Sequence, residues 1–236
     1  MKKRLHSPAN NLTIFISKDL KKDNLLLTTL KAKGFEVVHQ SLIKISPIRF
    51  SYAPKSQWIF FSSKNAITHF FGQNPEIDPG TKFGVMGQSS AAYLEEFGKK
   101  ADFIGTGTDT AKIAKDFAAC IQNDTVLFPQ AIDSLQTIQK HLAFNNISSN
   151  LYVYKTTLIT DFDLPQTDML VFTSPSNVRA WFAKYKSAEG QIIVAMGTST
   201  LRELNNYGVK EAAMPDSFDE EGLLEAILKQ VETSLL

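Results

Sequence analysis

Short apolar runs alternate with amphipathic stretches along most of this chain. The apolar runs are rich in Ile, Val and Phe, and several end in Ser, Thr or Gly. This alternation is typical of strand–helix units built around a mostly parallel sheet, so it predicts the α/β class. The clearest predicted strands are residues 12–17, 58–63, 82–87, 125–129, 169–174 and 191–197.

The stretches between these runs have the spacing of apolar positions expected of helices. Gly34, Gly98 and Gly208 follow three of them, where glycine commonly ends a helix in the left-handed conformation. The predicted helices are residues 19–33, 64–72, 89–97, 109–120, about 133–143 and 219–232.

One strand–turn–helix pattern occurs twice. Residues 59–71, IFFSSKNAITHFF, align without gaps with residues 170–182, LVFTSPSNVRAWF. Further along, residues 85–98 align with residues 195–208, at nearly the same spacing. A repeat on this scale predicts two related halves, with the functional site expected between them.

Two β-prone segments do not fit the alternation, and we interpret residues 37–48 and 151–160 as paired extended linkers. The chain would then pass between two domains twice, which makes the first domain discontinuous. The sequence therefore predicts two similar three-layer α/β/α domains with parallel sheets, joined by a two-stranded linker. Domain 1 is expected to comprise residues 1–42 and 158–236, and domain 2 residues 46–153.

Composition narrows the class of protein. The 236 residues carry 25 Lys plus Arg and 24 Asp plus Glu, a net charge of +1 that argues against a nucleic-acid binder. A single cysteine, Cys120, and four scattered histidines predict no metal site. Cys120 lies in a helical run, where we expect a small buried hydrophobe. The apolar stretch near the N-terminus is too short for a signal segment or a membrane span, so we expect a cytoplasmic protein that does not bind membranes.

Hydroxyl-rich turns follow the repeated strands. Backbone N–H groups at the start of a helix lack intrahelical partners and suit carboxylate or phosphate, particularly where Ser, Thr or Gly precedes the helix. Two interpretations remain open: these residues only cap helices, or they also bind an acidic ligand at the carboxyl ends of the strands. The residues concerned are Ser62, Ser63, Gly87, Gln88, Ser89, Thr173, Ser174, Ser176, Asn177, Gly197, Thr198 and Ser199.

No standard catalytic motif accompanies these turns. The chain contains no GxxxxGK[ST] phosphate loop, and GTGTDT at residues 105–110 lacks the glycine spacing of a dinucleotide fingerprint. No Ser-His-Asp or Cys-His arrangement can be assigned from spacing. Either the reaction depends little on side chains, or the protein catalyses none.

Four segments together resemble the uroporphyrinogen-III synthase family. They occur in the family's order, and the similarity runs through the chain from about residue 12. The matching segments are VYKT at 153–156, VFTSPSNV at 171–178, AMGTST at 195–200 and SFDEEGLL at 217–224.

The resemblance implies an enzyme that cyclises the linear tetrapyrrole hydroxymethylbilane to uroporphyrinogen III. Water is lost and the last pyrrole ring is inverted, through a spiro intermediate and without a cofactor. The eight carboxylates of this substrate would give the hydroxyl-rich turns a purpose, because a few charge-assisted hydrogen bonds could fix its conformation. The family also implies a monomer whose only partner is this polycarboxylate.

The resemblance also indicates which residues form the site. Tyr154 becomes the candidate general acid, donating to the departing hydroxyl, although a strand tyrosine that packs between the domains is an equal alternative. Ser199 and Thr200 fall on the family's Thr-Thr pair and are expected to line the site with backbone N–H groups. The candidate partners of the carboxylates are Lys18, Lys64, Lys155 and Arg179. The alternative for each of them is a solvated surface charge that does not bind the substrate.

Three departures from the family weaken these residue assignments. Thr198 and Ser199 replace common Pro and Thr, and Ser17-Lys18 replaces Thr-Arg after the first strand. The alternative of another class is a non-catalytic two-domain protein that binds a small anion, and a third is an enzyme whose activity has decayed. The isomer of uroporphyrinogen that the protein forms would discriminate among them.

Overall fold

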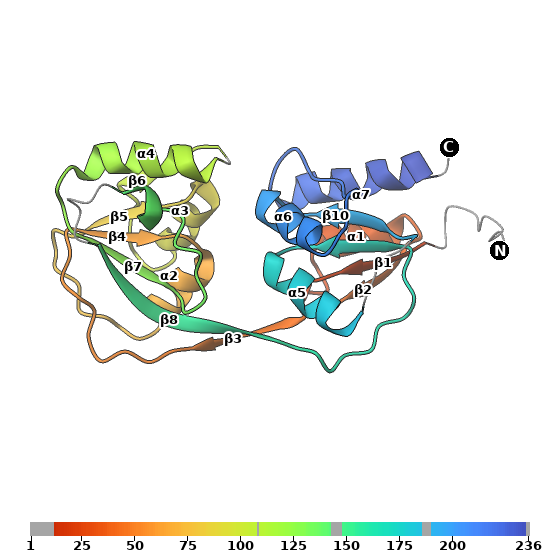
Figure 1. The fold of residues 1–236 in the computed structure, drawn as a ribbon, viewed down its shortest axis with the longest axis horizontal. Helices are drawn as coiled ribbons and strands as arrows, with labels where there is room; N and C mark the ends of the chain where they lie inside the picture. Colours follow the sequence, from red (N-terminus) through yellow and green to blue (C-terminus); the bar gives the residue numbers. More distant parts are fainter. Residues whose placement is uncertain (1–11, 108, 143–147, 186–189, 235–236) are drawn as a thin grey trace. The chain divides into compact units, whose positions relative to one another are not determined.

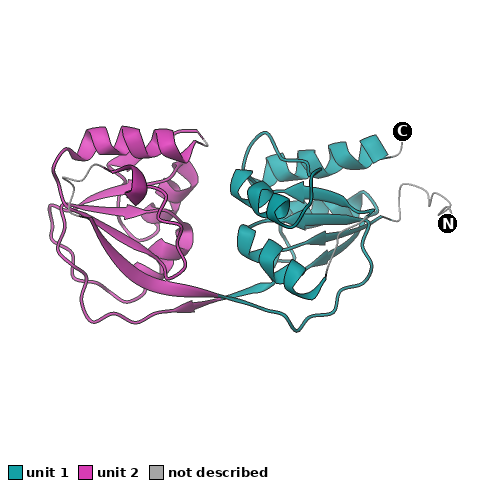
Figure 2. Ribbon diagram, in the orientation of Figure 1, with its two compact units in different colours: residues 1–44, 157–236 teal, residues 45–156 magenta. Residues whose placement is uncertain are grey.

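A computed structural model describes residues 12–107, 109–142, 148–185 and 190–234 (Figure 1). The chain divides into two compact units, and the first is made from both ends of the chain (Figure 2). Unit 1 comprises Met1–Lys44 and Thr157–Leu236, and unit 2 comprises Ile45–Thr156. The chain therefore passes from one unit to the other twice.

Unit 1 contains a four-stranded sheet in the order β10-β9-β1-β2, and all three pairings within it are parallel. Three of its strands are short, mostly buried apolar segments, whereas β2 at the edge has no buried residue. They are β1 (Thr13–Ile16), β2 (Glu36–His39), β9 (Met169–Phe172) and β10 (Ile192–Ala195).

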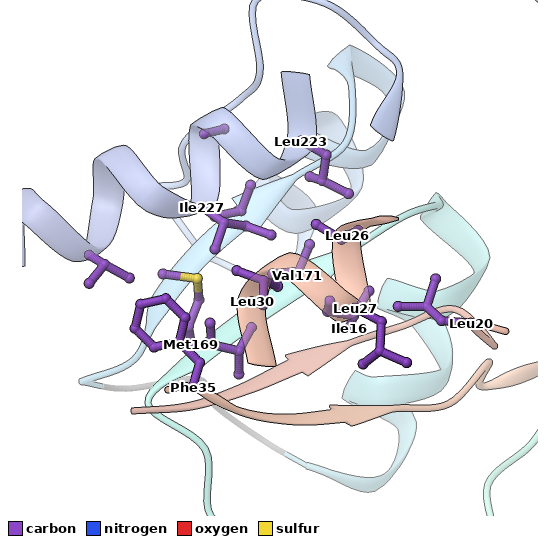
Figure 3. Packing of buried hydrophobic residues seen from close by; sticks show 14 residues of the cluster. Ile16, Leu20, Leu26, Leu27, Leu30, Phe35, Met169, Val171, Leu223 and Ile227 are labelled. Carbon is purple, nitrogen blue, oxygen red and sulfur yellow. The ribbon is translucent and has the colours of Figure 1, made fainter. Parts of the chain in front are cut away.

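Helices cover both faces of the unit 1 sheet. Alternate residues of each strand point to opposite faces, so each strand contributes apolar side chains to a cluster on either side. Ile16, Met169 and Val171 pack with α1 and α7 in one cluster, shown in Figure 3. Phe15 and Phe172 pack with α5 and α6 on the other face. These helices are α1 (Leu25–Ala32), α5 (Pro175–Lys184), α6 (Thr198–Asn206) and α7 (Glu220–Ser234).

Unit 2 contains a six-stranded sheet in the order β3-β8-β7-β4-β5-β6. The pairings from β8 to β6 are all parallel. The strands are β3 (Ile43–Pro47), β4 (Trp58–Phe61), β5 (Lys82–Val85), β6 (Phe103–Ile104), β7 (Val126–Ala131) and β8 (Ser148–Leu158).

The unit 2 sheet also has a core on each face. Ile59 and Phe61 pack with α2 and α3, whereas Trp58 and Phe60 pack with α4 and the segment around Ile138. The helices are α2 (Lys64–Phe71), α3 (Gln88–Glu95), α4 (Thr110–Ile121) and the 3₁₀ helix η2 (Gln139–His141). Both units therefore have the predicted three-layer α/β/α arrangement around a parallel sheet.

The internal repeat is visible in backbone geometry. Ser63, before α2, has φ −157° and ψ 155°, and Ser174, before α5, has φ −159° and ψ 156°. Gly87 and Gly197 have nearly identical extended conformations before α3 and α6. The sequence repeat thus corresponds to two copies of one β-turn-α-β-turn-α structure, one in each unit.

Two predicted helices and the expected burial of one residue need correction. A helix over 133–143 is wrong within the described part of this range, where only Gln139–His141 is helical and the positive φ of Gln136, 53°, interrupts an α-helix. The first helix begins at Leu25 and not at 19, because Asn24 caps it by accepting a hydrogen bond from the Leu27 N–H. Cys120, expected to be a buried hydrophobe, is exposed.

The two segments interpreted as linkers are extended, but they are largely parts of the sheets. Residues 36–39 form β2 in the unit 1 sheet, and β8 pairs with β7 in the unit 2 sheet from Ser148 to Tyr154. β3 and β8 are neighbours, and the Ile48 N–H donates to the Val153 carbonyl (2.8 Å). Each connection is therefore a strand that continues into a sheet.

Candidate functional site

The repeated turns lie side by side at the carboxyl edge of each sheet. In unit 2, Phe61 and Val85 are paired, so the turns that follow them, at Ser62–Ser63 and Met86–Gly87, are adjacent. In unit 1, Phe172 and Ala195 are paired in the same way. This edge is where ligands bind in open α/β sheets, since the helices there begin with unsatisfied N–H groups.

Tyr154 belongs to the carboxyl edge of the unit 2 sheet. It pairs with Ala131, the last residue of β7, and its carbonyl accepts a hydrogen bond from the Ile132 N–H (3.0 Å). Its side chain is 8% exposed, and its hydroxyl lies 3.2 Å from Oγ of Ser63. The ring of His69 lies 5.5 Å away, centroid to centroid. Tyr154 is therefore held in one orientation beside the turn that begins α2.

The surroundings of Tyr154 favour the neutral phenol. Burial raises its pKa, and the negative charge of Asp133 acts in the same direction, against the opposing effect of the Ser63 hydrogen bond. Burial lowers the pKa of His69, which favours its neutral form. Tyr154 thus remains a proton donor at neutral pH.

Ser63 and Ser174 cap the helices that follow them. Ser63 Oγ accepts from the Ala66 N–H (3.2 Å), and Ser174 Oγ accepts from the Asn177 N–H (3.3 Å). Each hydroxyl therefore takes the N–H of the third residue of its helix. In α2 this leaves the N–H groups of Lys64 and Asn65 to water or a ligand, and in α5 only that of Ser176, because Pro175 has none.

The neighbouring glycine turns are different, because no side chain caps α3 or α6. Gly87 and Gly197 hold extended backbone at the N-cap, and the first residues of both helices, at Gln88–Ser89 and Thr198–Ser199, are exposed. Their N–H groups, together with the positive end of the helix dipole, are suited to a carboxylate. Each unit thus places one capped and one uncapped helix start at the same edge.

Three of the predicted unit 1 residues have structural roles for their side chains. Asn177 is 3% exposed, and its Oδ1 accepts from the Leu42 N–H (2.8 Å). Thr200 is also 3% exposed, on the inner side of α6. Thr173 Oγ1 donates to the Ser17 carbonyl (2.8 Å). The structure removes the Asn177 and Thr200 side chains from the candidate ligands, because neither reaches the surface.

The candidate cations have different environments. Lys64 is exposed at the start of α2, with its ammonium 5.6 Å from the centre of the Tyr93 ring, and Lys155 is exposed on β8. Lys18 is paired with Glu220 (2.6 Å). Arg179 donates to Ser176 Oγ (2.9 Å) and lies 3.6 Å from Glu203, so both Ser176 and Arg179 are already engaged within unit 1.

Sequence reasoning missed two residues at these edges. Ser17, fully buried at the end of β1, accepts a hydrogen bond from the Thr173 N–H and so ties the β1 and β9 turns together. Phe218 is exposed beside the Gly197 turn. In the sequence, Ser17 stood out only as a departure from the family after the first strand, and Phe218 only as a member of the matching segment 217–224; no role at the site was predicted for either.

Other kinds of site find no support in the described part of the chain. Within it, no three His, Cys, Asp or Glu side chains are grouped so that they could hold a metal ion. Nor does any helix there combine the length and apolarity needed to cross a membrane. What these residues do form is a pair of α/β units with helix starts, hydroxyls and a buried phenol at carboxyl edges, typical of a protein that acts on an acidic small molecule.

Comparison with known proteins identifies the family. The family model described as uroporphyrinogen-III synthase HemD matches residues 25–225. A uroporphyrinogen-III synthase from Chlorobaculum parvum is 27% identical over an alignment of 227 residues. The alignment covers 86% of this chain and 92% of that protein.

Two solved structures share the fold. Uroporphyrinogen-III synthetase from Helicobacter pylori aligns with a TM-score of 0.66 at 14% identity, covering 93% of this chain and 99% of the other. A mutant uroporphyrinogen III synthase from the extremely thermophilic bacterium Thermus thermophilus aligns with a TM-score of 0.63 at 13% identity, covering 94% and 99%.

The chain belongs to the uroporphyrinogen-III synthase family. It is a lyase of tetrapyrrole biosynthesis that cyclises hydroxymethylbilane to uroporphyrinogen III, with loss of water and inversion of the last pyrrole ring. The resemblance noted in the sequence is therefore confirmed, and the alternative of a non-catalytic anion-binding protein is not supported.

Proposed function

We propose that the carboxyl edges of the two sheets bind the carboxylates of hydroxymethylbilane, and that Tyr154 is the general acid of the reaction. The observation that carries this proposal is the buried phenol of Tyr154, hydrogen-bonded to Ser63 at the start of α2. The turn of Ser63 is adjacent to the uncapped start of α3. A neutral, fixed donor at this edge is suited to a substrate whose acidic groups bind next to it.

The reaction requires little acid–base catalysis from the protein. The hydroxyl of the hydroxymethyl group leaves with its bonding electrons as the Tyr154 phenol supplies a proton, which releases water and leaves a methylene cation delocalised over its pyrrole. The substituted ring carbon of the last pyrrole attacks this cation and gives the spiro intermediate. The old bond from that carbon to its methylene bridge then breaks, the released bridge carbon bonds to the free ring carbon of the inverted pyrrole, and the proton lost from that carbon returns to the phenolate. Because pyrroles are electron-rich, orientation of the substrate contributes more than acid–base strength.

The carboxylates provide that orientation. In unit 2 the proposed contacts are the backbone N–H groups at Gly87, Gln88 and Ser89, the hydroxyls of Ser62 and Ser63, and the ammonium groups of Lys64 and Lys155. In unit 1 they are the N–H groups at Gly197, Thr198, Ser199 and Thr200, together with Thr173, Ser174 and Ser176. Each charge-assisted hydrogen bond contributes about 1.5–3 kcal/mol, so a few would select one conformation of a flexible chain.

We further propose that the enzyme acts as a cytoplasmic monomer, without metal, cofactor or nucleic acid. The near-neutral charge of +1 supports the last point, because a nucleic-acid binder needs an excess of basic residues. Light scattering of the purified protein tests the monomer, and a mass near twice 26.3 kDa would contradict it.

The isomer assay tests the catalytic proposal. Purified protein is incubated with hydroxymethylbilane, and the uroporphyrinogen isomers are separated after oxidation. We expect isomer III from the wild type and slow formation from Tyr154→Phe. Tyr152→Phe, two residues away on the same strand and 39% exposed, is the matched control and should behave as the wild type. Equal rates for Tyr154→Phe and wild type would overturn the role of Tyr154.

A further inference from the structure

Phe218 is an exposed aromatic side chain in the loop that precedes α7. Phe218 is 40% exposed. Contact of an apolar phenyl ring with water does not stabilise the folded protein. The ring lies against the Gly197 turn: a Cβ added at Gly197 would be 3.9 Å from both Cδ2 and Cε2 of Phe218. Phe218 therefore belongs to the carboxyl edge of the unit 1 sheet.

The loop that carries Phe218 is held from both sides. Asp219 Oδ1 accepts hydrogen bonds from the Gly222 N–H (2.8 Å) and from Ser217 Oγ (2.9 Å). Gly222 allows this close approach, because a Cβ there would lie 2.3 Å from the Ser217 carbonyl oxygen. The ring is thus presented to solvent by a backbone that is fixed before any ligand arrives.

The surroundings of the ring indicate the chemistry of its ligand. One side of Phe218 borders the uncapped start of α6. Lys18 follows the end of β1 and lies at the same edge. It forms a salt bridge with Glu220, two residues after Phe218. An aromatic face next to donors for an acidic group suits a flat ring that carries a carboxylate.

The equivalent place in unit 2 is built differently, which provides an internal comparison. Gly87 repeats Gly197 in backbone conformation, but a Cβ at Gly87 would face the Gly105 carbonyl oxygen at 3.8 Å. Gly105 in turn has no room for a side chain, because its own Cβ would lie 2.5 Å from the Met86 carbonyl oxygen. An aromatic side chain therefore lies against the glycine turn of unit 1 at Gly197, but not against the equivalent turn of unit 2 at Gly87.

We propose that Phe218 packs against a pyrrole ring of the tetrapyrrole whose carboxylate binds at the Gly197 turn. Phe218 would then be a substrate-binding residue of unit 1. The inference rests on the proposed binding of carboxylates at this edge, and it adds a contact to the rings themselves.

The test compares Phe218→Ala, Phe218→Leu and Phe218→Trp with the wild type. Measurements are the KM for hydroxymethylbilane, kcat, and the dissociation constant of uroporphyrinogen III under anaerobic conditions. Loss of aromatic packing should raise KM and the dissociation constant about tenfold in Phe218→Ala, with kcat nearly unchanged. Phe218→Trp should restore both values, and Phe218→Leu should fall between them. Tyr52→Ala removes an exposed aromatic residue of unit 2 and should leave both values as in the wild type.

The outcomes separate this inference from the proposed function. If Phe218→Ala folds and keeps the wild-type KM and dissociation constant while Tyr154→Phe is slow, the Phe218 contact is refuted and the catalytic proposal stands. If Tyr154→Phe is as fast as the wild type while Phe218→Ala binds weakly, the catalytic proposal fails and the ring contact stands. Weak binding in Phe218→Trp as well would refute aromatic packing.

Discussion

The hydroxyl of Tyr154 lies 3.2 Å from Oγ of Ser63, the residue that caps α2. One serine therefore serves both the start of a helix and the orientation of the candidate general acid. This arrangement links the stability of unit 2 to the chemistry of the site, and the two effects can be separated by mutation.

Replacement of Tyr154 by Phe should lower kcat about 100-fold, because it removes the proton donor and leaves the ring in place. The binding of product should change little, since the phenyl ring still packs with His69. Single-turnover kinetics with hydroxymethylbilane measure this effect. An unchanged rate of ring closure would mean that the tyrosine only packs in the fold.

Replacement of Ser63 by Ala should lower the free energy of unfolding by about 1 kcal/mol, as expected for a lost helix cap. Ser174→Ala is the matched control, because it removes the equivalent cap from α5 in unit 1. The observed hydrogen bonds of Ser174 are with Asn177 and involve no tyrosine hydroxyl. Both variants should lose similar stability in denaturant titrations.

A double-mutant cycle isolates the Ser63–Tyr154 contact from the cap. Ser63→Ala and Tyr154→Phe should show a coupling of about 0.5–1.5 kcal/mol in stability, the usual value for a hydrogen bond. Strictly additive effects would show that the two hydroxyls do not interact in solution.

Replacement of Asn177 by Ala should lower stability by about 1–3 kcal/mol, because it leaves the buried N–H of Leu42 without its acceptor. KM and kcat should stay close to wild type if Asn177 only supports the fold. Ser62→Ala, at an exposed position of the equivalent unit 2 turn, should instead leave stability within about 0.5 kcal/mol. A raised KM in Asn177→Ala with unchanged stability would contradict this assignment.

Replacement of Gly222 by Ala should destabilise the protein by about 1–3 kcal/mol, because the new methyl would overlap the backbone of Ser217. The Phe218 loop would have to shift, so KM should rise as well. Gly80→Ala is the control, since nothing lies within 4 Å of a Cβ at that position. Thermal unfolding and KM, measured on both variants, check the prediction.

Alkaline pH offers a test of the environment of Tyr154. Burial raises its pKa in the folded protein above the value of about 10 in the unfolded chain. The stability that this shift contributes is fully present below pH 10 and is lost as pH rises through the folded pKa, because the unfolded chain releases its proton first. Wild type should therefore lose stability faster than Tyr154→Phe above about pH 10 in pH-dependent denaturation. Parallel curves for the two proteins would contradict a raised pKa.

Local pattern was enough to predict much of this protein. The apolar runs and the repeat gave the α/β class and two similar halves, because strands, helix starts and helix-ending glycines depend on neighbouring residues. Ser63 and Ser174 were recognisable as equivalent caps, since capping involves an N–H only three residues away. The family resemblance, carried by a few short segments, then indicated the reaction.

Other features depend on which segments the fold brings together. Asn177 looks like an exposed turn residue in sequence, but its partner Leu42 is 135 positions away. Ser17 and Thr173 meet only because β1 and β9 pair in the sheet, and Phe218 faces Gly197 only because α7 packs on the same unit. A predicted helix at 133–143 failed because the backbone turns back at Gln136.

The sequence by itself thus determined the two parallel α/β halves, the turns at their carboxyl edges and the tetrapyrrole chemistry. Only the tertiary structure decided which of those polar residues face solvent and which are used within the fold. The physical reason is that burial and hydrogen bonding between distant segments depend on strand order and helix packing, which no local pattern of residues records.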